Sequence, residues 1–179
     1  MMGVLRGCVV AMFCLACASA GMAQPNRRDP LTQAEAEQIR EAGIYPTERV
    51  KLYTEFVDEH VSTIKGLTAR AHSPAWATKM DNELQDVAAL IDELGSNLDM
   101  YSDRKADVRK ALKPLTEATQ RWLDVLHGLP ADPAFDLSRK DAEASGKDLA
   151  DQAAQMLKEQ TEYFKVHKDQ RGQERAEPQ

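Results

Sequence analysis

The stretch MDNELQDVAALIDELGSNLDMY, residues 80–101, decides the fold. Its apolar residues recur at alternating spacings of four and three, which is the period of an α-helix with one buried face. The strict alternation of a β-strand does not persist anywhere in this stretch. A stripe of this width favours helices that pack at a shallow angle. It consists of Met80, Leu84, Val87, Ile91, Leu94, Leu98 and Tyr101.

Two helices are predicted before this stretch. Thr32 and Glu35 have the spacing of a capping box, and Gly43 supplies a stop, so the first helix is short. Pro46 opens the second helix, at a position where a missing N–H costs nothing. The stripe of the second helix is Val50, Tyr53, Val57, His60, Ile64, Leu67 and Ala71.

Two helices are also predicted after it. We expect Ser102 to cap one of them, Pro114 to bend it and Gly128 to end it. Ser138 is expected to cap the last helix, whose small residues would let a neighbour approach closely. The two stripes are Val108, Leu112, Leu115, Thr119, Trp122 and Leu126, and then Ala142, Leu149, Ala153, Met156, Gln160, Tyr163 or Phe164, and His167.

Short turns at 72–75 and 100–103 force consecutive helices to run antiparallel. We therefore predict an all-α fold, an antiparallel up-down-up-down four-helix bundle with a short extra N-terminal helix, over residues 32–168. The helix from 76 to 99 is acidic and the helix from 103 to 127 is basic, so these two are expected to lie side by side. An elongated α-solenoid is the alternative, although no repeat of fixed period is visible.

Residues 1–23 have the character of a signal peptide. A basic Arg6 precedes an apolar run at 9–18 that is too short to span a bilayer. Cleavage is expected after Ala23, with Ala20 as the second choice, and lipidation at Cys17 is a further alternative. We therefore expect a periplasmic or secreted bacterial protein.

Composition narrows the chemistry further. All three cysteines lie inside the signal, so the exported chain would carry no disulfide, cysteine zinc site or thioether-linked haem. The net charge of −6 argues against nucleic-acid binding, and no later run is long and apolar enough for a membrane span. Residues 24–31 and 169–179 are polar and are expected to form a disordered leader and a disordered tail.

Candidate metal ligands gather at one pole of the expected bundle. His72, His127 and Asp124 could hold a divalent metal there, and Asp124 and His127 share one helix face. The helix dipole by itself also favours histidines at helix C-termini, which is the alternative explanation. His60 is interpreted as a histidine at the core edge with a hydrogen-bond partner, and His167 is the one position suited to a haem ligand. The same pole collects Trp76, Trp122, Asp132, Phe135 and Asp136.

The connection at 128–137 is predicted to be an ordered plug over this pole. Leu129, Phe135 and Leu137 are large apolar residues with no helix of their own to cover them, and two prolines stiffen the segment. The side chains of Trp76 and Trp122 are expected to face this connection.

A basic cluster stands apart from the apolar pattern. It could contact an anionic lipid head group or polymer, or form a solvated face opposite the acidic helix. Common catalytic motifs such as H-E-x-x-H, G-x-S-x-G and a glycine-rich phosphate loop are absent from the sequence. No cofactor is predicted, and an enzyme is the less favoured class. The cluster comprises Arg104, Lys105, Arg109, Lys110 and Lys113.

Two resemblances bear on function. The segment PLTQAEAEQIREAG, residues 30–43, resembles the LTxxQ-type helix start of the exported Spy and CpxP-like helical chaperones, which implies a chaperone-like or stress-related role in the periplasm. The run from Leu31 through YPTERVKLYTEF (31–56) and the later segment DMYSDRKADVRKALKPL (99–115) are similar to uncharacterised secreted helical proteins of soil bacteria, and this implies no activity. We expect an exported bundle with a binding or structural role toward an unknown protein or envelope partner, with a homodimer possible.

Overall fold

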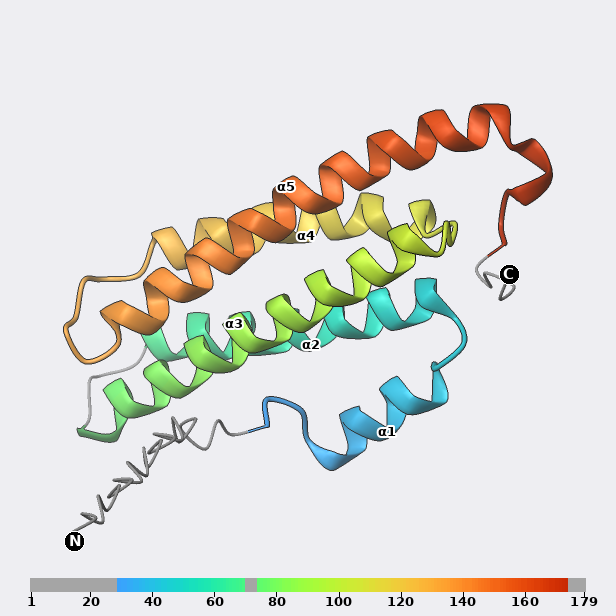
Figure 1. The fold of residues 1–179 in the computed structure, drawn as a ribbon. Coiled ribbons are helices and arrows are strands. Elements are labelled where there is room, and N and C mark those ends of the chain that lie inside the picture. Colours follow the sequence, from blue (N-terminus) through green and yellow to red (C-terminus); the bar gives the residue numbers. More distant parts are fainter. Residues whose placement is uncertain (1–28, 70–73, 174–179) are drawn as a thin grey trace, which may run out of the picture.

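Each apolar stripe of the sequence becomes the buried face of a helix. The computed structural model describes residues 29–69 and 74–173, and these are helical with no β-strand, which confirms the all-α class (Figure 1). Within this part of the chain, no helix is both long and apolar enough to cross a bilayer. The elements are α1 (Gln33–Glu41), α2 (Pro46–Thr68), α3 (Pro74–Asp103), α4 (Arg109–His127), α5 (Asp136–Val166) and the 3-10 helix η1 (Lys168–Gln170).

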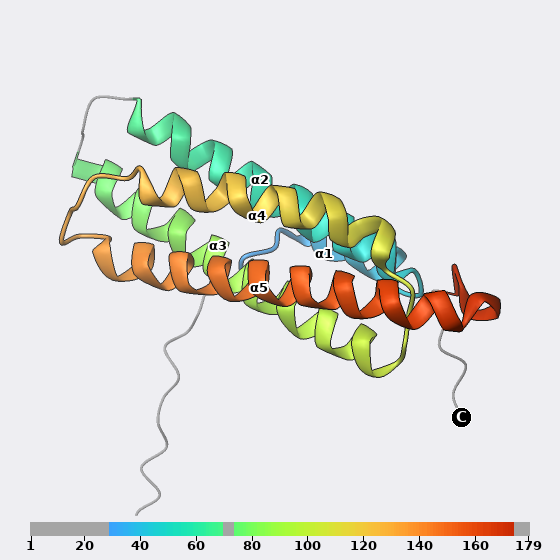
Figure 2. The same cartoon turned by 90° about the horizontal axis from the view of Figure 1, so that it is seen from above.

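The four long helices pack in a ring whose order differs from the chain order. α2 contacts α3 and α4, and α5 contacts the same two helices, as Figures 1 and 2 also show. α3 and α4 do not contact each other among the described residues, so the expectation that these two lie side by side is wrong. Apolar burial decided the order, because exposed charge pairs contribute at most about 1 kcal/mol each while a buried leucine contributes about 1.5 to 3 kcal/mol.

Small residues on α5 allow the close packing that the sequence predicted. Ala142 and Ala153 are fully buried. A Cβ atom added to Gly146 would lie 3.2 Å from Leu123 Cδ2 of α4. Of the two aromatic residues considered for the end of this seam, Phe164 is the buried one.

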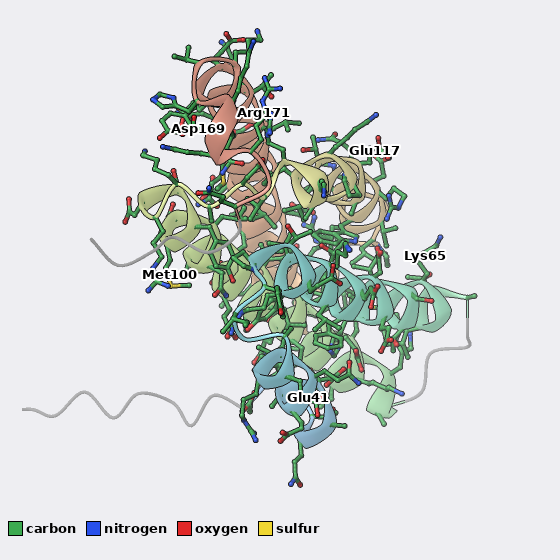
Figure 3. All side chains as sticks on the ribbon, turned by 90° about the vertical axis from the view of Figure 1, so that its right-hand side faces the viewer. Glu41, Lys65, Met100, Glu117, Asp169 and Arg171 are labelled. Atoms are coloured by element: carbon green, nitrogen blue, oxygen red, sulfur yellow. The ribbon has the colours of Figure 1, made fainter. Side chains whose placement is uncertain are left out.

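The first two helices begin where the local sequence signals predict. Thr32 and Glu35 form the predicted capping box, with each side chain bonded to the backbone of the other. Pro46 is the first residue of α2, also as predicted. α1 lies outside the ring, where Ile39 joins the core against α2 (Figure 3).

Two predicted helix starts are wrong. Ser102 lies inside α3, which ends in a Schellman-type turn in which Lys105 has φ of 55° and Ala106 N–H donates to Tyr101 O. Glycine is the usual residue at this left-handed position, so a lysine there does not indicate in the sequence that a helix ends. Ser138 lies within α5, and its hydroxyl instead donates to Asp81 Oδ1 of α3 at 2.6 Å.

The prediction that the connection at 128–137 forms a plug is confirmed in part. Phe135 and Leu129 are buried, and the Phe135 ring meets Trp76 edge-on with centroids 5.5 Å apart, as predicted. Leu137 is 73% exposed, so its predicted burial is wrong, because helix α5 already begins at Asp136 and turns this side chain outward. Trp122 is fully buried and its indole N–H donates to Asp58 Oδ1 at 2.6 Å.

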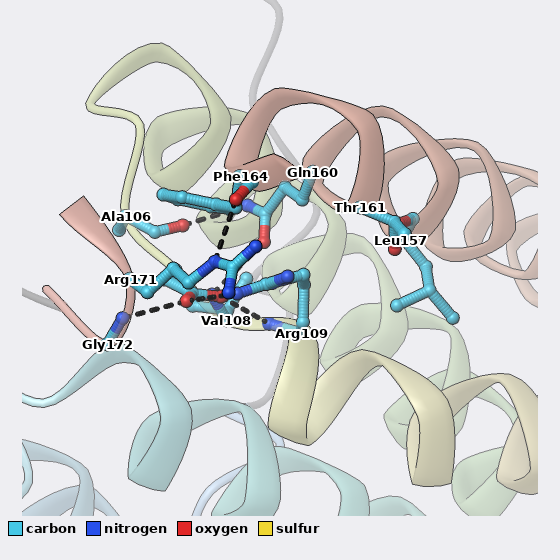
Figure 4. Close-up of polar contacts among 10 residues, drawn as sticks. Ala106, Val108, Arg109, Leu157, Gln160, Thr161, Phe164, Arg171 and Gly172 are labelled. Atoms are coloured by element: carbon cyan, nitrogen blue, oxygen red, sulfur yellow. Dashed lines mark hydrogen bonds and ion pairs between the residues drawn. The ribbon is translucent and has the colours of Figure 1, made fainter. Parts of the chain in front are cut away.

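The segment that follows α5 is ordered by one buried carboxylate. Asp107 accepts hydrogen bonds from Arg109 Nε at 2.8 Å and from the Gly172 N–H at 2.9 Å (Figure 4). The Asp107 N–H donates to Gln173 O. The tail expected to be disordered from residue 169 therefore forms a bonded turn over 168–173, because Asp107 supplies a partner that the tail sequence does not show. The remainder of that tail, the leader at 24–28 and the signal at 1–23 lie outside the described residues.

Asp107 makes the stability of this region dependent on pH. Burial raises the pKa of the Asp107 carboxyl, but hydrogen bonds from Arg109 and Gly172 outweigh burial and hold the pKa below its ordinary value of 3.8. Because the folded-state pKa is lowered, the stabilisation is fully present above the unfolded-state pKa of about 3.9 and is lost as the pH falls through the folded-state pKa.

Asp107→Asn is therefore expected to lower the Tm near neutral pH. The Tm difference from the wild type should begin to shrink near pH 4 and should close only once the pH is below the lowered folded-state pKa of Asp107. Thermal unfolding followed by circular dichroism from pH 7 to pH 2 measures this. Asp124→Asn, at an exposed carboxylate, serves as the control and should track the wild type throughout. A Tm difference that stays constant over the whole range would contradict the assignment.

Candidate metal centre

A cleft of about 400 Å³ opens where the segment leading into α1 faces α2 and α3. Leu31 and Thr32 form one wall, and His60 of α2 with Glu83 and Asp86 of α3 form another. Within the described residues, α1 contacts α2 but none of the other helices, and its Ile39 belongs to the apolar core.

Three side chains with metal-ligating atoms converge in this cleft. His60 Nδ1 lies 2.8 Å from Glu83 Oε2, and one ligand atom each from His60, Glu83 and Asp86 lie within 4.8 Å of one another. The side chains of His60 and Glu83 are 18% and 16% exposed, and Asp86 is buried. Within the described residues, this is the one group of three or more such side chains close enough to share an ion.

The register of α2 against α3 places these residues. Polar side chains reach across the same interface at two further levels, where the Tyr53 hydroxyl donates to Glu93 and Arg49 donates to Asn97. Residue numbers rise along α2 as their partners fall along α3, so His60 must meet Glu83. Asp86 follows one turn later on the same face of α3, since residues three apart in a helix are neighbours.

The charge of the cleft favours a cation. Five carboxylates line it, and no lysine or arginine does so among the described residues. Carboxylates gathered in a cleft with low-dielectric walls raise the local concentration of cations. Glu35 is already held by the capping box with Thr32, so it contributes charge rather than a free ligand. The five are Asp29, Glu35, Glu59, Glu83 and Asp86.

One imidazole and two carboxylates form a ligand set that divalent transition metals accept. Zinc binds histidine nitrogen and carboxylate oxygen at about 2.0 to 2.2 Å, and three protein ligands leave at least one coordination position open. A metal ion bound to both side chains would take the place of the His60–Glu83 hydrogen bond. The surrounding helices hold all three side chains in place, so little ordering is needed on binding.

Two of the three residues predicted as metal ligands from the sequence lie outside this cleft. Asp124 and His127 are exposed on α4, and His72 lies outside the described residues. Asp132 accepts from the Ala134 N–H, and Asp136 pairs with basic residues of its own helix.

The other two histidines singled out in the sequence are His60 and His167. His60 is at the core edge with a hydrogen-bond partner, as predicted. His167 stacks on the Tyr163 ring with centroids 4.0 Å apart. The pair Glu83 and Asp86, three residues apart on α3, was the available signal for the cleft, but it became meaningful only once the register brought His60 beside it.

The chain matches no family model, no curated protein and no solved structure. The resemblance of residues 30–43 to the Spy and CpxP-like proteins stays a prediction.

Proposed function

We propose that this protein binds a divalent transition-metal ion in the cleft between α1, α2 and α3. The observation that carries the proposal is the convergence of His60, Glu83 and Asp86 at the floor of a cleft lined by carboxylates. The sequence favoured a binding or structural role toward a protein or envelope partner, and a metal-binding bundle was its less favoured alternative. The signal-like character of residues 1–23 supports a place in the periplasm or outside the cell.

We further propose that the four long helices act as an up-down-up-down bundle built from two hairpins, α2–α3 and α4–α5. Cross-helix bonds support antiparallel pairing within each hairpin, since Arg49 reaches Asn97 in the first and Gln160 reaches Ala106, just before α4, in the second. The metal ligands come from both helices of the first hairpin, so the site exists only while that hairpin keeps its register.

A chaperone-like role receives less support. Proteins that hold unfolded clients expose contiguous apolar surface. Here the apolar stripes of α2 to α5 are buried against one another. Among the described residues, the large apolar side chains that are exposed are Ile44, Tyr45, Leu137 and Val166.

The test is a calorimetric titration of the purified protein with ZnCl₂. We expect one zinc ion per chain, and a Tm that rises with zinc concentration because the ion binds the folded state alone. At free zinc about 100 times Kd, the added stability would be about 2.7 kcal/mol. His60→Ala is expected to weaken zinc binding by more than about 100-fold, since even the outer-shell partners of metal ligands are commonly worth 10- to 100-fold.

Two variants make this test specific. His127→Ala removes an exposed histidine outside the cleft and should bind zinc like the wild type. Glu83→Gln can still accept the hydrogen bond from His60 but lacks the negative charge, so it should keep the fold and lose zinc. If His60→Ala and Glu83→Gln both bind zinc as tightly as the wild type, the cleft is not a metal site and the His60–Glu83 contact serves only to join α2 to α3.

A further inference from the structure

A second candidate binding site lies in a groove of about 580 Å³ where the start of α4 meets the end of α5 and the segment after it. Arg109 and Lys110 come from the first turn of α4. Arg171 comes from the C-terminal segment and lies near Arg109 (Figure 4). Leu157 and Thr161 of α5 complete the wall. None of these residues takes part in the metal centre.

The groove carries excess positive charge in a chain whose net charge is −6. Asp107 is its one carboxylate, and that group is already engaged by Arg109 Nε at 2.8 Å and by a second Arg109 nitrogen at 2.7 Å. Among the described residues, no carboxylate forms an ion pair with Lys110 or Arg171. The first turn of α4 contains no acidic residue. Within residues 29–69 and 74–173, these two cations therefore have no paired carboxylate.

Both guanidinium groups are held in place by Phe164. Arg171 Nε donates to the Phe164 carbonyl at 2.8 Å, and the Arg109 guanidinium lies 4.6 Å from the centroid of the Phe164 ring. Arg171 uses only its Nε–H for the bond to this carbonyl, so its other guanidinium nitrogens can face a ligand. A side chain fixed in this way loses less conformational entropy on binding than a free surface arginine does.

We propose that this groove binds a phosphate group, with Arg171 and Lys110 as the contacting cations. Phosphate suits the site because a planar guanidinium can donate two parallel hydrogen bonds to it while an ammonium group adds a point charge. Leu157 offers an apolar contact beside the cations, so the phosphate can belong to a larger molecule. The source is either a soluble phosphate compound or the head group of an anionic lipid.

The first arm of the test uses inorganic phosphate, added at constant ionic strength to the purified ¹⁵N-labelled protein. We expect saturable NMR shifts confined to the amides of residues 109–110 and 171–172. Lys110→Gln and Arg171→Gln should each weaken binding about tenfold, the effect of losing one charge-assisted contact of about 1.4 kcal/mol. Lys165→Gln, at an exposed lysine paired with Glu162, should leave phosphate binding unchanged.

The second arm uses sedimentation with vesicles of phosphatidylcholine alone or mixed with phosphatidylglycerol. Binding to the mixed vesicles that is lost in Lys110→Gln identifies a lipid head group as the source, whereas phosphate binding without vesicle binding identifies a soluble ligand. Lys110 is exposed and makes no hydrogen bond through its side chain among the described residues, so its substitution leaves the fold intact. The absence of saturable binding in both arms, or binding that both groove variants retain in full, would overturn the proposal.

Discussion

Phe135→Ala is expected to lower the free energy of unfolding by about 3 to 5 kcal/mol, as large-to-small substitutions of buried aromatic residues do. Phe135 is 1% exposed, although it belongs to a connection and not to a helix. Its ring fills the space over Trp76, edge to face with an interplanar angle of 77°. Removing it leaves a cavity and also loses an aromatic contact that contributes about 0.5 to 1.5 kcal/mol.

Chemical denaturation followed by fluorescence measures both consequences. Trp76 is buried now and would gain access to water, so emission should shift to longer wavelength, although only in part because Trp122 stays covered. Leu137→Ala is the matched control, two residues away and exposed, and should change stability by less than about 0.5 kcal/mol. Wild-type stability and emission in Phe135→Ala would show that the plug contributes nothing to the fold.

Gln160→Ala is the second substitution with a large expected effect, about 2 to 6 kcal/mol. The Gln160 side chain is buried and serves the turn between α3 and α4 in both directions: its Nε2 donates to Ala106 O at 2.8 Å, and its Oε1 accepts from the Val108 N–H at 3.1 Å. Ala106 and Val108 are themselves buried, so both backbone groups lose their side-chain partner in a buried position. A buried backbone group left without a partner costs about 1 to 3 kcal/mol, and two groups are affected.

Equilibrium unfolding in urea tests this expectation. Gln155→Ala provides the control on the same helix, because Gln155 is exposed and bonds only to Glu159 among the described residues. Hydrogen exchange adds a local measurement, since the Val108 amide should lose its protection in Gln160→Ala before the amides of α2 do. A variant as stable as the wild type would mean that the turn holds its conformation without Gln160.

The proposed metal site shows which features the sequence could not reveal. The sequence placed His60 at the edge of the core and predicted a hydrogen-bond partner, and both are confirmed. The metal ligands predicted from the sequence were His72, Asp124 and His127, because the expected topology brings the ends of several helices together at one pole. Glu83 and Asp86 were single acidic residues on a solvated face until α2 was paired with α3.

The sequence by itself determined the all-α class, the buried stripes, the capping box at Thr32 and the start of α2 at Pro46. Each depends on residues within about four positions along the chain, and the helical period and the caps act over that distance. Only the tertiary structure decided the order of the helices around the ring, the bond from Ser138 to Asp81 and the anchoring of residue 172 by Asp107. The two hydrogen bonds join residues 57 and 65 positions apart in the chain. The helix order depends on which apolar faces bury the most surface against one another, and no local sequence pattern contains that information.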